Sequence, residues 1–320
     1  MLQEIVGHKT QIAQLTAQVD VGRIPSAYLF CGPEGVGKKM VALHFARLLL
    51  CEAAKDRPCN KCSACHKVDS LSHPDLFFVA PEKFIITIDQ IRELQQDISL
   101  HAMEGRYKVV IIDEAHGMNR AAANSLLKTL EEPPPATHLI LVTSRENMLL
   151  PTIISRCQRV QFQALCNDEV KNYLVGTKKM QKDSAETMSR ISCGSIGTAL
   201  SMDSAVVQDV VSVIIKVFTS ISPEFIIDTS KAWGDDTPNI PLRLHLIALW
   251  CRDLLLAKIG LGPKNLYFSN FSRDIENIAR SRSSNKLEGS LGGILALQAD
   301  AEGTYNKQLM FEQLLFKLPA

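Results

Sequence analysis

The sequence lacks an excess of charge of either sign. Its 320 residues include 35 lysines and arginines against 34 aspartates and glutamates, so the formal net charge is +1. This balance argues against a strongly basic surface that coats nucleic acid and against a tail that binds polyanions. A local basic face is still compatible with it. Glycine and proline are also few, at 17 and 14 residues, which argues against a fibrous or disordered chain.

The sequence also lacks a long uncharged hydrophobic run. The most apolar stretch is Leu242 to Gly260, and it contains Arg243, Arg252, Asp253 and Lys258. A membrane span does not tolerate that many charges, so we interpret this stretch as a buried helix. Residues 1–10 lack the apolar segment of a signal peptide. We therefore expect a cytoplasmic protein without a membrane partner.

The first half of the chain alternates strand and helix patterns. Expected strands are Ala27–Cys31, Leu76–Val79, Val109–Ile112, Leu139–Val142 and Arg159–Phe162. Expected helices are His8–Val21, Lys38–Leu50, Ile88–Leu100 and Asn119–Glu131. Strands that are apolar throughout suit a sheet buried on both faces. The alternation predicts a fold of the α/β class, a parallel sheet with helices on both sides.

Beyond Phe162 the strand pattern fades and only helical patterns remain. Residues 164–205 favour short helices around Gly194 and Gly197. Longer helices are expected at Ala205–Phe218, at Leu242–Ile259 and from Leu291 to the C-terminus. The length predicts two or three domains. We expect three: an α/β domain at 1–163, a small helical domain at 164–205 and an all-α domain at 206–320.

A glycine-rich segment joins the first strand to the next helix. Gly32, Gly35 and Gly37 precede Lys38 and fit the pattern G-x-x-x-x-G-K between strand and helix. Such a loop holds phosphate with its backbone N–H groups and the helix N-terminus. The next position normally carries a hydroxyl that binds Mg²⁺, and here it is Lys39. A cation there repels the metal, so we expect a phosphate-binding loop with impaired hydrolysis.

A pair of carboxylates ends the strand Val109–Ile112. In a nucleotide site Asp113 would lie beside Mg²⁺ and Glu114 would polarise the attacking water. The alternative, Asp113 as a plain helix N-cap, is weaker once the phosphate loop is taken into account. The strand Leu139–Val142 ends in Thr143 and Ser144, and a hydroxyl there is expected near the γ-phosphate.

Ser155-Arg156-Cys157 directly precedes the last predicted strand. Arg156 is either an ordinary surface charge or an arginine finger that reaches the nucleotide of a neighbouring subunit.

Four of the nine cysteines are clustered within fifteen residues, namely Cys51, Cys59, Cys62 and Cys65. Four thiolates suit tetrahedral Zn²⁺ with no open position, which predicts a structural site. A redox pair at Cys62 and Cys65 is the alternative, and His66 is an alternative ligand. The other five cysteines are scattered.

Together these segments resemble the clamp-loader subunits of bacterial DNA polymerase III, which are AAA+ ATPases. The residues that carry the resemblance are the phosphate loop, the cysteine insert, Asp113–His116, Leu126–Pro134 and Ser155–Cys157. The resemblance covers residues 1–205 well, whereas residues 206–320 resemble these subunits only in their helical pattern. It implies an AAA+ domain with a zinc module (51–65), a helical lid domain and a C-terminal collar domain that assembles a ring. It also implies that Arg156 acts as an arginine finger in trans.

Two kinds of clamp-loader subunit share these features, the gamma/tau ATPase motor and the delta-prime stator. The motor has Thr or Ser at the position of Lys39, and its lid has a phosphate-sensing Arg where this chain has Gly197. Both differences favour the stator type, with Glu114 vestigial and the chain's own ATPase weak or absent. Lys38 and Glu114 are retained, so weak binding of ATP and Mg²⁺ stays open, as does the alternative of an active motor.

The resemblance also implies partners. They are the motor and delta subunits in a ring of five, with the sliding clamp and primer-template DNA reached through the complex. A third interpretation, a zinc module that binds nucleic acid by sequence, is disfavoured by the near-zero net charge.

Overall fold

The computed structural model describes residues 5–53, 56–219, 222–299 and 306–318. The chain divides into two compact units. The first is Met1–Val170 with Gly194–Gly197, and the second is Lys171–Cys193 with Thr198–Ala320. The expectations for residues 1–4 and for parts of the C-terminal helix (300–305 and 319–320) fall outside the described residues.

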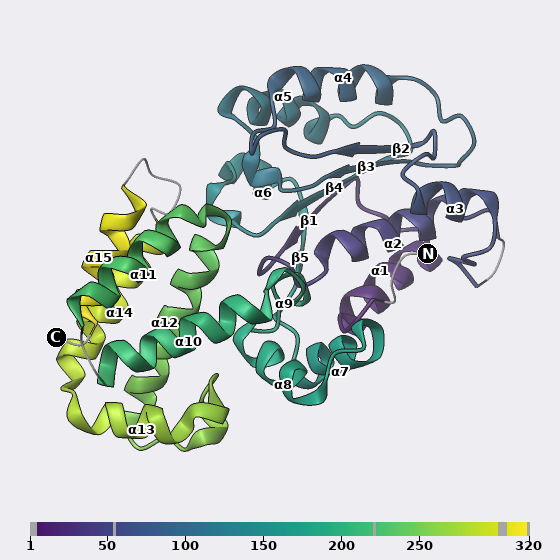
Figure 1. Ribbon diagram of the computed structural model, residues 1–320. Coiled ribbons are helices and arrows are strands. Elements are labelled where there is room, and N and C mark those ends of the chain that lie inside the picture. The colour runs from purple at the N-terminus through teal and green to yellow at the C-terminus, as the bar shows by residue number, and fades with distance from the viewer. Residues whose placement is uncertain (1–4, 54–55, 220–221, 300–305, 319–320) are drawn as a thin grey trace. The chain divides into compact units, whose positions relative to one another are not determined.

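The first unit is built on a five-stranded sheet (Figure 1). Its strands are β1 (Ala27–Cys31), β2 (Leu76–Val79), β3 (Lys108–Ile112), β4 (Thr137–Thr143) and β5 (Gln158–Gln161). The order is β2-β3-β4-β1-β5, and every pairing is parallel. The predicted α/β class and all five predicted strands are therefore confirmed. Cys31 pairs with Thr143 and Ile112 with Leu141, so the segments that follow β1, β3 and β4 meet at one edge.

Helices cover both faces of this sheet (Figure 1). They are α1 (Lys9–Val21), α2 (Lys38–Leu50), α3 (Ser63–Asp69), α4 (Ile88–Ser99), α5 (Arg120–Glu131) and α6 (Pro151–Ile154), with short 3₁₀ turns η1 (Ala115–Gly117) and η2 (Glu146–Met148). One core joins α1 and α2 to the sheet through Phe30, Phe45 and other apolar side chains. The other joins α4 and α5 to the opposite face through Ile91 and Leu126. All these core side chains are almost fully buried, which makes hydrophobic burial the main stabilising contribution of the unit.

Local sequence signals explain where these helices begin. Thr87 and Gln90 form a capping box at the start of α4, and the Asn119 side chain accepts the Ala122 N–H at the start of α5. These bonds satisfy N–H groups that lack partners inside the helix. Three prolines after Glu132 keep α5 from continuing.

Asp75 organises the loop before β3. The side chain is almost fully buried, and it accepts the backbone N–H groups of Met103, Glu104 and Gly105 at 2.7, 2.8 and 2.6 Å. Burial alone would raise the pKa of Asp75, but the three N–H donors lower it below its usual range. A charged Asp75 therefore fixes the path of this loop.

The second unit is helical. It contains α8 (Lys182–Ile191), α10 (Ser204–Thr219), α11 (Pro223–Asp235), α12 (Ile240–Lys258), α13 (Ser272–Ser281), α14 (Ser284–Ala299) and α15 (Lys307–Lys317), with the turns η3 (Thr237–Asn239), η4 (Pro263–Asn265) and η5 (Ser269–Phe271). Two more helices, α7 (Asn167–Lys178) and α9 (Ile196–Ser201), have residues in both units. Helix α12 lies at the centre and contacts α10, α13 and α14, with Trp250 fully buried.

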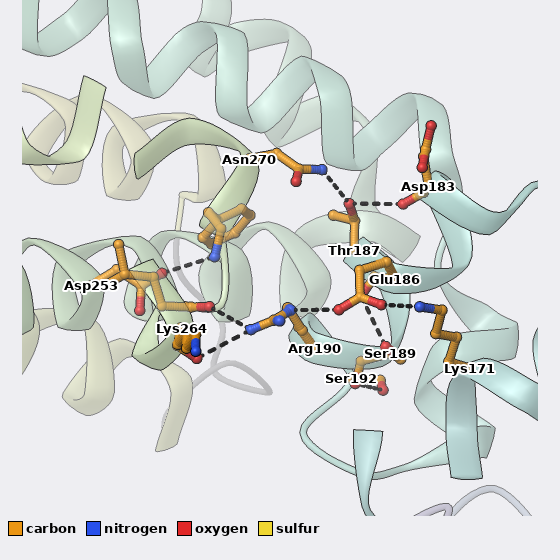
Figure 2. A network of polar contacts seen from close by, with 12 residues as sticks. Lys171, Asp183, Glu186, Thr187, Ser189, Arg190, Ser192, Asp253, Lys264 and Asn270 are labelled. Atoms are coloured by element: carbon orange, nitrogen blue, oxygen red, sulfur yellow. Dashed lines mark hydrogen bonds and ion pairs between the residues drawn. The ribbon is translucent and has the colours of Figure 1, made fainter. Parts of the chain in front are cut away.

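A polar network fastens α8 to the segment that follows α12 (Figure 2). Arg190 donates to the backbone oxygens of Lys264 and Leu266, both at 3.3 Å. Its Nε also donates to Glu186 at 3.0 Å, and Lys171 pairs with the same carboxylate. Asn270 donates to the Thr187 hydroxyl at 3.1 Å. Residues 171–193 are thus bound to the C-terminal helices within one unit.

The helical half departs from the predictions in three places. The sequence patterns do not predict α11 and α13, of which α13 has 10 residues and is mostly polar. The helix predicted from Leu291 instead starts at Ser284, and α15 is separate from it. Gly289, Gly292 and Gly293 within α14 weaken the helical signal. In the described part of the chain, no helix is both long and apolar enough to cross a bilayer.

Candidate functional site

The phosphate loop has the expected backbone conformation. Gly32, Gly35 and Gly37 all have positive φ angles, of 150°, 69° and 108°. A Cβ at Gly32 would lie 2.3 Å from the backbone oxygen of Phe162, so only glycine fits where the loop passes the end of β5. The loop and the start of α2 therefore form the turn that the sequence pattern predicts.

Lys38 points into its own loop. Its Nζ donates to the backbone oxygens of Gly32 at 2.8 Å and Pro33 at 2.5 Å, and the residue is 6% exposed. Burial lowers the pKa of this amine. In this conformation two loop carbonyls take up hydrogen bonds that a bound phosphate would otherwise receive.

Lys39 forms an ion pair across the site. Its Nζ lies 3.1 Å from a carboxylate oxygen of Asp113 and 4.5 Å from the centre of the Phe78 ring. Asp113 is the carboxylate expected beside Mg²⁺, so an ammonium group occupies the side of the site where the metal would bind. The sequence predicts that Lys39 repels a divalent ion, and its contact with Asp113 is a second obstacle to metal binding.

Glu114 and the end of β4 complete this edge of the sheet. Glu114 is exposed and has a left-handed backbone with φ of 45°. The buried Thr143 hydroxyl lies 3.1 Å from Nδ1 of His116 and accepts the Arg145 N–H at 3.1 Å. Ser144, the residue proposed from the sequence, is the next residue and partly exposed. The Thr143 hydroxyl is the more buried of the two, and the role of Ser144 stays a prediction.

Gly197 lies directly on the phosphate loop. Its N–H donates to the backbone oxygen of Gly35 at 2.8 Å, and a Cβ at Gly197 would lie 2.8 Å from the Gly35 Cα. On the other side, Nε2 of His8 is 2.7 Å from the Val36 oxygen. Two segments far away in the sequence therefore bond the loop backbone. A larger residue at position 197 would clash with Gly35, so either the phosphate loop or the segment that contains residue 197 would have to move.

The four clustered cysteines form a candidate metal centre. Their Sγ atoms all lie within 4.8 Å of one another, and those of Cys51 and Cys62 are 4.0 Å apart. Four sulfurs around Zn²⁺ at about 2.3 Å are about 3.8 Å apart, so the arrangement fits a tetrahedral zinc ion. His66 is exposed and is not part of the group.

Backbone N–H groups point at three of these four sulfurs. The N–H groups of Cys59, Cys62 and Cys65 point at the sulfurs of Cys51, Cys59 and Cys62, at 3.3 to 3.5 Å. Backbone hydrogen bonds from Lys61 and Cys62 lower the pKa of Cys59 to about 6, whereas burial raises the pKa values of Cys51 and Cys65. Thiolates are the zinc-binding form, so Cys59 is the cysteine of the cluster most ready to bind a metal ion.

Arg156 lies at the surface beside the ends of two helices. Its Nη2 is 2.6 Å from Oε1 of Glu131, the last residue of α5, and its Nη1 donates to the Thr152 oxygen of α6 at 3.0 Å. The Arg156 side chain is 36% exposed and that of Glu131 is 52% exposed. The guanidinium is thus accessible, and it has an acidic partner that the sequence analysis missed.

The structure brings the predicted nucleotide residues together at one sheet edge and the four cysteines into one cluster. Arg156 is outside both groups. Sequence reasoning missed the Gly197 contact, the carbonyl partners of Lys38 and the pairing of Arg156 with Glu131. The Gly197 contact and the Arg156 pair join segments far apart in the sequence, so they have no local signal, whereas the partners of Lys38 lie within its own loop and were missed because the motif predicts a lysine directed at phosphate.

Comparisons with known proteins identify the family of the chain. A family model described as DNA polymerase III, delta subunit, matches residues 7–166. The DNA polymerase III subunit delta' of Bacillus subtilis is 30% identical over 311 residues, which span 94% of this chain and 92% of that protein. The delta' subunit of Pseudomonas aeruginosa is 44% identical over 134 residues, 41% of each chain.

The chain is also similar to a tau subunit of DNA polymerase III. The tau subunit of B. subtilis is 34% identical over 206 residues, 62% of this chain but 36% of that protein. Among solved structures, a gamma subunit-related protein of Thermotoga maritima aligns over 97% of this chain and 100% of its own, with 18% identity and a TM-score of 0.46.

Proposed function

This chain belongs to the family of DNA polymerase III delta' subunits, and on that premise we propose that it is the stator of a clamp loader. In this role it supports ATP-dependent loading of the sliding clamp during DNA replication without hydrolysing ATP itself. The observation that carries the proposal is the contrast between a phosphate loop blocked by this chain's own residues and an exposed Arg156.

The blocked phosphate loop supports a non-motor role. Hydrolysis of ATP needs Mg²⁺ bound beside Asp113 and a lysine directed at the β- and γ-phosphates. Here Asp113 is paired with Lys39, and Lys38 is bound to loop carbonyls. Gly197 has no side chain that could sense a γ-phosphate. Each feature removes one part of the hydrolytic machinery.

The alternative is an active motor of the gamma/tau type. The similarity to the tau subunit and the presence of Lys38 and Glu114 favour it. Weak binding of ATP is compatible with both functions, because the glycine loop keeps its backbone conformation. Repeated turnover by this chain is expected only of the motor.

Arg156 is the residue we propose to act on a neighbour. Its guanidinium is partly exposed and stabilises negative charge that develops on a transferred phosphoryl group. Such a finger works from outside the nucleotide site of its own chain, so the blocked loop does not affect it. The neighbour would be a motor subunit, in a ring that also contains a delta subunit and reaches the clamp and primer-template DNA.

The four cysteines would hold one structural zinc ion. Zinc with four thiolate ligands keeps no open position for catalysis and contributes folding energy. Their place between α2 and β2 makes this segment an insertion into the α/β unit. We propose that the ion orders this insertion.

The test is a clamp loader reconstituted with the Arg156→Ala variant of this chain. We expect the complex to assemble normally and to lose about 10³-fold or more of the hydrolysis at the one neighbouring site, with a sharp loss of clamp loading. Arg159→Ala is the matched control, because Arg159 is also a partly exposed arginine paired with a glutamate. An unchanged rate with Arg156→Ala would contradict the proposal.

A further inference from the structure

We propose that Glu131 is a positioning residue that competes with the neighbour's nucleotide for Arg156. The proposal rests on the proposed role of Arg156 in trans. Glu131 holds the guanidinium against the ends of α5 and α6 while no phosphate is present, and the γ-phosphate of the adjacent subunit takes its place when ATP is bound there.

The geometry shows a held arginine. Arg156 follows α6 by two residues, and its side chain folds back across that helix to the Thr152 oxygen at 3.0 Å. The second contact, 2.6 Å from Nη2 to Oε1 of Glu131, joins it to α5, which itself contacts α6. The carbonyl ends of both helices carry partial negative charge, which adds to the attraction. One rotamer of Arg156 is therefore favoured in the subunit alone.

The same geometry makes the contact easy to replace. Only one Glu131 oxygen meets the guanidinium, and both side chains are partly exposed, so water screens the pair. A guanidinium has five N–H donors in a planar fork that matches phosphate oxygens. A terminal phosphate offers more negative charge than one carboxylate, and several acceptor oxygens. It therefore competes effectively for the donors that Glu131 uses.

The fold by itself does not explain a glutamate at this position. Glu131 is the last residue of α5, where a negative side chain opposes the helix dipole. Its carboxylate is compensated by Arg156 and by no other cation within the described residues. Glu132 is the next residue, is equally acidic and exposed, and forms no ion pair in the part of the chain described. The two glutamates differ chiefly in their contact with Arg156.

The experiment compares ATP hydrolysis by reconstituted complexes without clamp or DNA. Glu131→Gln keeps the size of the side chain and removes its charge, and Glu132→Gln is the matched control. We expect Glu131→Gln to raise kcat/KM by up to about fivefold, equivalent to about 1 kcal/mol for a partly exposed ion pair. Glu132→Gln should leave it unchanged. In the Arg156→Ala background, Glu131→Gln should have no effect, because the arginine through which it acts is absent.

The outcomes separate this inference from the proposed function. If Arg156→Ala alone leaves hydrolysis unchanged, the role of Arg156 in trans fails, and this inference fails with it. If Arg156→Ala abolishes the activity of one site but Glu131→Gln lowers or does not change kcat/KM, only the competition is overturned. An increase that Glu132→Gln shares, or that persists without Arg156, also overturns it. Glu131→Ala serves as a second variant, and thermal melting checks that each variant is folded.

Discussion

At the scale of single residues, Lys39 determines what the phosphate loop can do. It stands where a metal-binding hydroxyl is expected, and its ammonium lies 3.1 Å from Asp113. The two opposite charges attract each other, and a divalent ion that approaches this carboxylate oxygen meets the ammonium group. The identity of Lys39 predicts repulsion of the metal. Its ion pair with Asp113 depends on how two adjoining segments meet at the sheet edge.

Asp75 gives a prediction about stability and pH. Its folded-state pKa is lowered, so the stability that it contributes is present above the ordinary carboxyl pKa near 4 and is lost as the pH falls through the lower folded-state value. We expect Asp75→Asn to cost about 2 kcal/mol at pH 7, because three backbone N–H groups lose a buried, charged acceptor. Urea unfolding of the wild-type protein and of Asp75→Asn, at pH 7 and at pH 3, measures this loss of unfolding free energy.

The difference in unfolding free energy between wild type and Asp75→Asn should shrink toward pH 3. Asp89→Asn is a suitable control, because Asp89 is an exposed aspartate on α4 whose pair with Arg92 is also exposed. A difference of the same size at both pH values would show that the charge of Asp75 is not what holds the loop.

At the scale of elements, the cysteine segment is a small unit of its own between α2 and β2. Helix α3 has seven residues and is too short to be stable without tertiary support. Cys62 caps it, and Lys67 ties it to Glu104 at 2.7 Å. A metal ion bound by these cysteines, one of which lies within α3, would supply much of the remaining stabilisation of this segment.

The metal prediction is one Zn²⁺ for each chain. Cys62→Ser should lose the metal and lower the thermal stability, while the parallel sheet stays folded on its two cores. Cys166→Ser, at an exposed cysteine outside the cluster, should keep it. Elemental analysis of protein purified without chelator measures the content, and circular dichroism checks the fold. Protein without zinc, or full zinc content in Cys62→Ser, would contradict the metal site.

The strands and the cysteine cluster could be predicted because their signals are local. Runs such as Val109–Ile112 are apolar at every position, and four cysteines close together need little further folding to meet. The partner of Arg156 could not be predicted in this way. Glu131 is 25 residues away, and the sequence does not show that the ends of α5 and α6 lie together.

At the scale of the whole molecule, the chain divides into two compact units, and the division into three domains stays a prediction. Residues 171–193, expected to belong to a separate lid, are grouped with the C-terminal helices. Arg190 and Asn270 make the contacts that join them, across 76 and 83 residues of sequence (Figure 2). Separations of this size are beyond any local pattern. The boundaries near 163 and 205 stay a prediction.

The near-zero net charge of the chain is compatible with its proposed role. A subunit that acts on a protein neighbour through one arginine does not need a strongly basic surface. Arg156 is proposed to act on the neighbour's nucleotide, while Lys38 and Lys39 of this chain's own phosphate loop are bound to loop carbonyls and to Asp113.

Titration of the isolated, zinc-loaded chain with ATP and Mg²⁺ tests the stator role most directly, with heat of binding and phosphate release followed together. We predict no hydrolysis above the level of a Lys38→Ala control, and at most weak binding that Mg²⁺ does not strengthen. Sustained multiple-turnover hydrolysis that depends on Mg²⁺ and is lost in Lys38→Ala would show a motor and contradict the stator role.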